Sequence, residues 1–161
     1  MLTLGIDPGT ASLGWGLVEE GGGGLKACAY GCVKTSPKMT SSERLGILHG
    51  EIRSIIKKYQ PDCLAVEKLF FGKNAKTAIS VGQARGVILL LAAEESLPVG
   101  EYTPLEVKIA ATGYGKADKF QMQQMVKTLL KMKEIPKPDD AADALAVAIC
   151  HLNSYKLAAK A

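Results

Sequence analysis

Two acidic residues end apolar segments at places where proteins often bind ligands. Asp7 lies in Gly-Ile-Asp-Pro-Gly-Thr, and Glu67 closes the segment Leu-Ala-Val-Glu. Both segments are typical of strands, so we expect both carboxylates at the carboxyl edge of a sheet, where open α/β sheets bind ligands. The structural alternatives are a turn-initiating aspartate before Pro-Gly and a glutamate that reaches solvent at the end of its strand.

Two further acids open the last predicted helix. Asp140 and Asp143 share one helix face, with about 4.5 Å of axial rise between them. The two divalent ions of phosphodiester-cleaving enzymes sit about 3.5–4 Å apart, so one helical turn can serve both. Helix capping explains one of the acids Asp139 and Asp140. It does not explain Asp143, which interrupts a run of alanine and β-branched residues that must pack.

All four candidate ligands are carboxylates, with no histidine or cysteine among them. Hard oxygen donors of this kind favour Mg²⁺ or Mn²⁺ over zinc. His49 flanks the apolar stripe of an earlier helix. His151 follows Asp143 by about 12 Å along a helix axis, which is too far to share an ion with it. The sequence therefore predicts a magnesium site, which Mn²⁺ can also occupy.

The pattern of apolar residues predicts the elements that must position these acids. Strands are predicted at 2–7, 13–18, 25–33, 63–67 and 98–102. Helices are predicted from the capping box of Thr40 and Glu43 to Pro61, and at 75–95, 104–111, 118–132 and 139–152. This order indicates an α/β fold with a mixed five-stranded sheet and helices on both faces. No repeat or linker interrupts it, so residues 1–161 are predicted to form a single domain.

Two features of the predicted elements concern packing. Trp15 shares a strand face with two leucines and is expected in the core. The segment 87–93 is apolar all round, which predicts burial on more than one side of its helix. Gly82 and Gly86 lie one turn apart on the same helix and would let a neighbouring chain approach closely. This helix is the candidate dimer interface.

The bulk properties limit the class of protein. A net charge of +4 favours a polyanionic partner only weakly. The four cysteines form no Cys-x-x-Cys motif and are expected to be reduced thiols. No apolar run reaches the roughly 20 residues of a membrane span, and the N-terminus begins with strand-like sequence rather than a signal peptide. We therefore expect a cytoplasmic protein with no membrane partner.

Basic and aromatic residues near the acids are candidates for binding nucleic acid. The lysines in loops and at helix starts are Lys73, Lys76, Lys108, Lys116 and Lys119. A solvated surface is the ordinary alternative for such lysines. Tyr114 belongs to the glycine-containing loop 112–116, whose backbone amides can approach phosphates. Phe70 and Phe71 cannot share one strand face, so we expect at least one to be exposed, where it can stack on an unpaired base.

Five motifs in this order and spacing resemble the RuvC family over nearly the whole chain. They are Gly-Ile-Asp-Pro-Gly-Thr at 5–10, Val-Glu at 66–67, Lys-Asn-Ala at 73–75, Gly-Gln-Ala-Arg-Gly at 82–86 and Asp-Ala-Ala-Asp-Ala-Leu-Ala at 140–146. The resemblance implies a ribonuclease H-like fold. It also implies a crossover (Holliday) junction endodeoxyribonuclease that hydrolyses phosphodiesters with two Mg²⁺ ions and leaves 5′-phosphate ends.

The resemblance further implies roles for individual residues and partners. The metal-binding carboxylates of the family correspond to Asp7, Glu67, Asp140 and Asp143. Lys108 and Lys119 correspond to positions beside the active site that act on the scissile phosphate or the backbone, and Phe70 corresponds to a base-stacking wedge. A homodimer matches the near two-fold symmetry of a four-way junction. The RuvA–RuvB branch-migration complex is a partner implied by resemblance alone.

Two other classes of protein remain as alternatives. Actin-like sugar or acetate kinases also begin with a strand followed by Asp-x-Gly-Thr, but they need a second related domain that 161 residues do not contain. A non-catalytic DNA-binding scaffold of the same fold would be free to lose its carboxylates, and this chain has all four. A metal-dependent nicking assay and an ATP-turnover assay separate the three classes.

Overall fold

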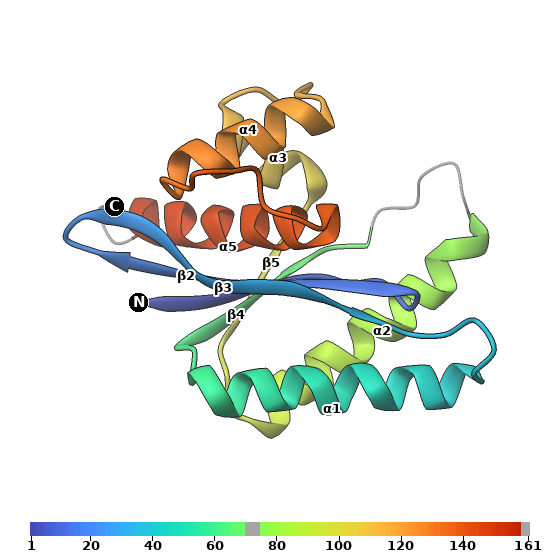
Figure 1. Cartoon of the computed structure of the whole chain (residues 1–161). Coiled ribbons are helices and arrows are strands. Elements are labelled where there is room, and N and C mark those ends of the chain that lie inside the picture. Colours follow the sequence, from blue (N-terminus) through green and yellow to red (C-terminus); the bar gives the residue numbers. More distant parts are fainter. Residues whose placement is uncertain (70–74, 159–161) are drawn as a thin grey trace.

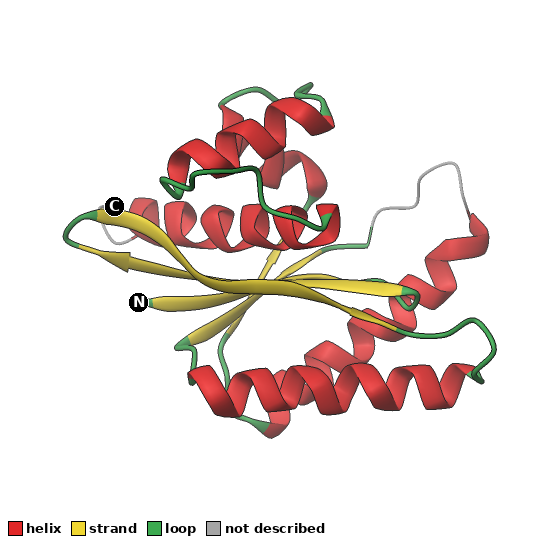
Figure 2. Cartoon of the chain, in the orientation of Figure 1, coloured by secondary structure: helices red, strands yellow, loops and turns green. Residues whose placement is uncertain are grey.

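A twisted five-stranded sheet forms the centre of the molecule, seen here in a computed structural model that describes residues 1–69 and 75–158 (Figures 1 and 2). From edge to edge the strands are β3 (Gly24–Lys34), β2 (Ser12–Gly21), β1 (Leu2–Asp7), β4 (Cys63–Glu67) and β5 (Val99–Tyr102). β2 is antiparallel to β1 and β3, whereas β4 is parallel to β1 and β5. The predicted mixed sheet is confirmed, and the carboxyl ends of β1, β4 and β5 meet at one edge.

Helices cover both faces of this sheet, as predicted (Figure 1). One face carries α1 (Ser41–Tyr59) and α2 (Ala75–Glu94). The other face carries α5 (Asp139–Ala158), with α3 (Pro104–Thr112) and α4 (Lys119–Leu129) packed on the outer side of α5. The backbone alone is described for Ala75, Lys76 and residues 156–158. Helix α5 is therefore enclosed between the sheet and two other helices.

Each face of the sheet has its own hydrophobic core. On one face, Leu4 and Leu64 of the sheet pack with Ile52 of α1 and Ile88 of α2. On the other face, the buried residues of α5 contact α3 and α4. Between 141 and 152, every residue of α5 is buried except Asp143 and His151. Burial of apolar surface, which stabilises by roughly 25 cal/mol for each Å² removed from water, therefore holds α5 against the sheet.

Capping boxes begin three of the helices. Thr40 and Glu43 form the predicted box at the start of α1, where the Thr40 side chain accepts from the Glu43 amide. Equivalent boxes begin α3 and α4, through Thr103 with Glu106 and Asp118 with Gln121. The predicted boundaries of the strands and helices hold to within a few residues, except that α5 continues past 152 to Ala158.

Helix α2 is less buried than its sequence predicts. Within the described chain it buries Ala84, Ile88, Leu91 and Ala92, whereas Ile79 and Leu90 are 73% and 57% exposed. Its stretch Thr77–Glu94 is long and apolar enough to span a membrane by length and composition alone, a test that the core helix of a soluble protein also passes. One side of that stretch packs on α1 and the sheet. The other side carries apolar residues that the single chain leaves uncovered.

Candidate active site

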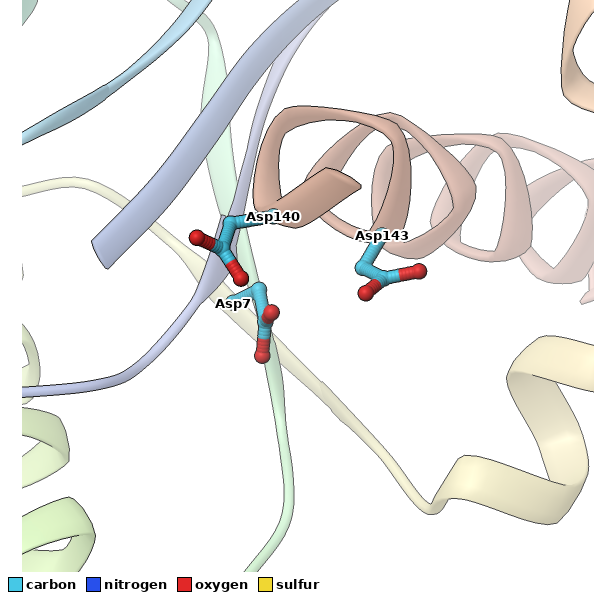
Figure 3. A group of neighbouring side chains, drawn as sticks. All are labelled: Asp7, Asp140 and Asp143. Atoms are coloured by element: carbon cyan, nitrogen blue, oxygen red, sulfur yellow. The ribbon is translucent and has the colours of Figure 1, made fainter. Parts of the chain in front are cut away.

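Three aspartates from two elements lie together at the carboxyl edge of the sheet (Figure 3). Asp7 ends β1, and Asp140 and Asp143 lie in the first turn and a half of α5. Each offers one carboxylate oxygen, and these three oxygens lie within 4.8 Å of one another. Oxygen donors at this spacing suit a hard divalent cation such as Mg²⁺.

Glu67 joins this group from the neighbouring strand. Ile6 of β1 is paired with Val66 of β4, so the next residues, Asp7 and Glu67, leave adjacent strands at the same level. Glu67, Asp7 and Asp143 line one cavity of about 240 Å³. The structure therefore brings the four predicted ligands to one site.

Two strand glycines permit the close approach of α5 that brings its aspartates to the edge. A Cβ atom at Gly14 would collide with the backbone carbonyl of Asp140, and a Cβ atom at Gly5 would collide with that of Ala144. Glycine within a strand often marks such a close backbone approach. Both residues were visible in the sequence, but their partner on α5 lies more than 120 positions away and was not predicted.

The surroundings of Asp7, Glu67 and Asp143 disfavour the charged form of each carboxylate. Burial, followed by the negative charges of Glu67, Asp143 and Asp140, raises the pKa of Asp7 to about 8. Burial and then Asp143 raise the pKa of Glu67 to about 7. Burial also raises the pKa of Asp143, although the Lys119 ammonium opposes it. Clustered carboxylates of this kind bind protons in the absence of a cation and exchange them for one when it is present.

Two lysines line the same cavity as the carboxylates. Lys119, at the start of α4, places its Nζ 3.6 Å from Oδ2 of Asp143 and 3.4 Å from Oδ2 of Asp139. Burial lowers the pKa of Lys119, but the nearby carboxylates, Asp143 first, more than offset this and raise it above its usual value. Lys108 of α3 lines the cavity and lowers the pKa of Glu67. Both ammonium groups are close to the carboxylates yet partly exposed.

The first two acids of α5 have different surroundings. Ser12 of β2 donates a 2.5 Å hydrogen bond to Oδ2 of Asp140, which fixes that carboxylate beside Asp7. Asp139 is the first residue of the helix rather than the expected capping residue, and its carboxylate lies 3.2 Å from Nζ of Lys137. The lysines lower the pKa of Asp139. Ser12 is a site residue that the sequence analysis missed, because a serine opening a strand carries no distinctive signal.

The structure describes only some of the predicted DNA-binding residues. Tyr114 is 57% exposed, and Lys116 is exposed in the same loop between α3 and α4. Lys76 lies in the first turn of α2, and its side chain is outside the described part of the structure. Phe70 and Lys73 lie outside the described residues altogether.

Comparisons with known proteins agree with this geometry. The family model "Crossover junction endodeoxyribonuclease RuvC" matches residues 3–151. The curated protein of that name from Desulforamulus reducens is 60% identical over 151 residues, covering 94% of this chain and 93% of the relative. Among solved structures, Thermus thermophilus RuvC superposes with a TM-score of 0.91 at 37% identity, covering 98% of this chain and 97% of that one. The structure of T. thermophilus RuvC with a Holliday junction substrate gives 0.88 at 35% identity, covering 98% and 96%.

The sheet order, the enclosed helix α5 and the acidic edge define a nuclease of the ribonuclease H-like class. Within that class, the chain belongs to the RuvC family of crossover junction endodeoxyribonucleases. Membership excludes the sugar or acetate kinase alternative.

Proposed function

We propose that this protein resolves four-way (Holliday) DNA junctions by paired symmetric nicks in recombination and repair, with two Mg²⁺ ions held by Asp7, Glu67, Asp140 and Asp143. The observation that carries the proposal is the meeting of three aspartate oxygens within 4.8 Å at the sheet edge, beside Glu67 and two lysines. The T. thermophilus relative bound to a Holliday junction substrate supports the choice of DNA structure.

The donor set fits the proposed ions. All four groups are carboxylates. Burial, followed by the negative charges of its neighbours, raises the pKa of Asp7 to about 8, and a bound cation would oppose this rise. When bound, two such ions supply an activated water and stabilise the leaving 3′-oxygen of a phosphodiester. Mn²⁺ prefers the same donors and is expected to substitute.

The residues around the carboxylates would orient and neutralise the DNA phosphate. Lys119 and Lys108 line the same cavity as the carboxylates, where their charges can offset the negative charge that develops on the phosphate. Ser12 keeps the Asp140 carboxylate in place through its hydrogen bond. In-line attack by water leaves a 5′-phosphate and a 3′-hydroxyl.

Further residues would hold the arms of the junction. Their candidates are Phe70, Lys73, Lys76, Tyr114 and Lys116, with Phe70 as the group that stacks on an unpaired base. Tyr114 and Lys116 are exposed on the loop that follows α3, the helix that carries Lys108. Lysines in these positions would bind phosphates largely without regard to sequence.

The uncovered apolar side of α2 supports a homodimer. Ile79 and Leu90 are exposed there, as is Gly86, which has no side chain to keep a neighbour away. A second copy of the same helix would cover these residues and place two active sites for paired nicks. The same proposal gives the apolar stretch of α2 a protein partner instead of lipid, as expected for a cytoplasmic enzyme. The RuvA–RuvB complex is the further partner that family membership suggests.

A cleavage assay tests the proposed activity. The protein is incubated with a synthetic four-way junction or a linear duplex of matching sequence, each with Mg²⁺ and with EDTA. We expect symmetric nicks with 5′-phosphate ends in the junction only, and only with Mg²⁺. Binding of the junction without cutting under any metal condition would instead indicate a non-catalytic scaffold.

A further inference from the structure

An apolar hollow lies beside the catalytic cavity, and none of the four carboxylates lines it. The hollow has a volume of about 190 Å³ and is lined by Thr103, Pro104, Leu105, Lys108 and Gly115. We call it the Leu105 hollow. It lies where α3 begins and where the loop between α3 and α4 passes over that helix.

The Leu105 hollow and the catalytic cavity share a wall. Pro104 and Lys108 line both of them, so the hollow begins where the acidic cavity ends. A nucleotide next to the scissile phosphate is covalently attached to it and cannot leave this neighbourhood. A DNA strand seated on the carboxylates would therefore pass Lys108 and bring an adjoining nucleoside to the hollow.

The lining of the hollow suits an apolar, flat group. Leu105 of the lining is 56% exposed although it is a large apolar side chain, and Ile109, one turn further along the same helix and outside the lining, is 50% exposed. The hydroxyl of Thr103 is already bonded to Glu106 in the capping box of α3. Exposed apolar groups gathered next to a site mark binding surfaces. The face of a nucleobase is the apolar part that DNA can offer.

The loop that forms the other side of the hollow is held in place. The hydroxyl of Thr112 donates to the carbonyl of Lys108 at 2.8 Å, and the amide of Tyr114 donates to the Thr112 hydroxyl at 3.1 Å. Gly115 then faces α3 with no side chain, and a Cβ atom there would lie 2.7 Å from Cδ1 of Leu105. The open space depends on glycine at this position.

We propose that the Leu105 hollow is a nucleoside subsite, which holds the base of one nucleotide adjoining the scissile phosphate. The proposal rests on the proposed junction cleavage and adds a residue, Leu105, that positions the strand for it. Base contacts of this kind act on any base, because every base has an apolar face. The subsite therefore aligns the phosphate with the carboxylates.

Abasic junctions test the proposed subsite. Single-turnover cleavage is measured with Mg²⁺ on an intact four-way junction and on junctions that lack the base, but keep the sugar, at either nucleotide flanking the scissile phosphate. For the wild-type protein we expect one of the two abasic junctions to be cut about tenfold more slowly, the loss of one base contact. Leu105→Ala should cut the intact junction about tenfold more slowly and lose nothing further on that abasic junction.

A second variant and a control complete the test. Gly115→Ala adds a methyl group that displaces only the flexible end of Leu105, so it should narrow the hollow and slow cleavage while leaving the melting temperature unchanged. Met39→Ala removes an apolar side chain of similar exposure, 41%, ahead of α1 and should cut normally. The subsite would be overturned if the wild-type protein cut all three junctions at equal rates. It would also be overturned if the slowing caused by Leu105→Ala and the slowing caused by the missing base multiplied, because the two changes would then act independently. Failure of the proposed function would look different, because the wild-type protein would then cut no junction, and both proposals would fall.

Discussion

Asp7 carries a charge that the folded protein disfavours unless a cation is present. Its pKa of about 8 and that of Glu67, about 7, lie well above the usual range near 4 of an unfolded chain. The folded state therefore binds more protons than the unfolded state between about pH 4 and pH 8. In this interval the free energy of unfolding of the metal-free protein falls as the pH rises, because the folded state is the one that binds the extra protons.

This linkage gives a prediction for melting temperature and for Asp7→Asn. In chelator, the wild-type Tm should be lower at pH 8 than at pH 5, and Asp7→Asn should flatten that slope and raise the Tm at pH 8. Each kcal/mol corresponds to about 2–4 °C in a domain of this size. Added Mg²⁺ should raise the wild-type Tm at pH 8 but barely move the variant. The variant should bind junctions and not cut them; full cutting at saturating Mg²⁺ would contradict Asp7 as a metal ligand.

The neighbouring acids Asp139 and Asp140 are predicted to respond differently to the same change. Asp140→Asn removes a charge from the oxygens that meet at the sheet edge, so cleavage should fall by orders of magnitude. Asp139→Asn loses only exposed ion pairs with Lys137 and Lys119, which solvent screens, and should cut nearly normally. Matched cleavage rates on one junction measure both. An inactive Asp139→Asn beside an active Asp140→Asn would move the metal ligand by one residue.

The contact between α5 and the sheet determines whether Asp140 and Asp143 meet Asp7. A substitution at Gly14 tests this contact. A side chain at Gly14 would strike the backbone of Asp140, so Gly14→Ala must move α5 or β2. We expect a loss of about 1–3 kcal/mol, typical of overpacking, together with a smaller Tm increase on adding Mg²⁺. Gly46→Ala is the matched control: it lies within α1 with open space around it and should stabilise the protein by about 0.5–1 kcal/mol. Equal effects of the two changes in thermal unfolding would mean that α5 does not depend on this close contact.

The elements show how far sequence patterns reach. The alternation of the strands, the Thr40–Glu43 box and the i, i+3 spacing of Asp140 and Asp143 are local, and each predicted its element or its shared face. The contact of α5 with Gly14 depends on a pairing across most of the chain, which no local pattern encodes. The exposed side of α2 shows a related limit: apolar sequence predicts burial but does not say whether its own chain or another surface provides it.

At the scale of the whole molecule, the basic residues predict a strong salt dependence of junction binding. Phosphate contacts release counterions in proportion to their number, so affinity should fall steeply between about 50 and 200 mM salt. Lys116→Ala, at an exposed loop position, should make the slope shallower by about one contact and leave the folded state unchanged. Fluorescence anisotropy with a labelled junction in magnesium-free buffer measures the slope. A flat response would contradict a surface that tracks the DNA backbone.

The last prediction concerns the assembly that would pair the two nicks. Leu90 is 57% exposed on the uncovered side of α2, about one turn before the helix ends, so Leu90→Arg costs the single chain little packing. In a dimer built on α2 it would place two charges in an apolar contact, where unpaired charge is disfavoured by several kcal/mol. We therefore expect the variant to sediment as a monomer at concentrations where the wild-type protein is dimeric, with a similar circular dichroism spectrum. Met39→Arg, at an exposed apolar position ahead of α1, should remain dimeric.

A plasmid with an extruded cruciform gives the functional readout, because paired nicks linearise it and single nicks leave an open circle. The wild type should produce linear DNA, and Leu90→Arg should accumulate open circles because each monomer cuts independently. A Leu90→Arg protein that stays dimeric and linearises the plasmid would place the interface elsewhere on the molecule.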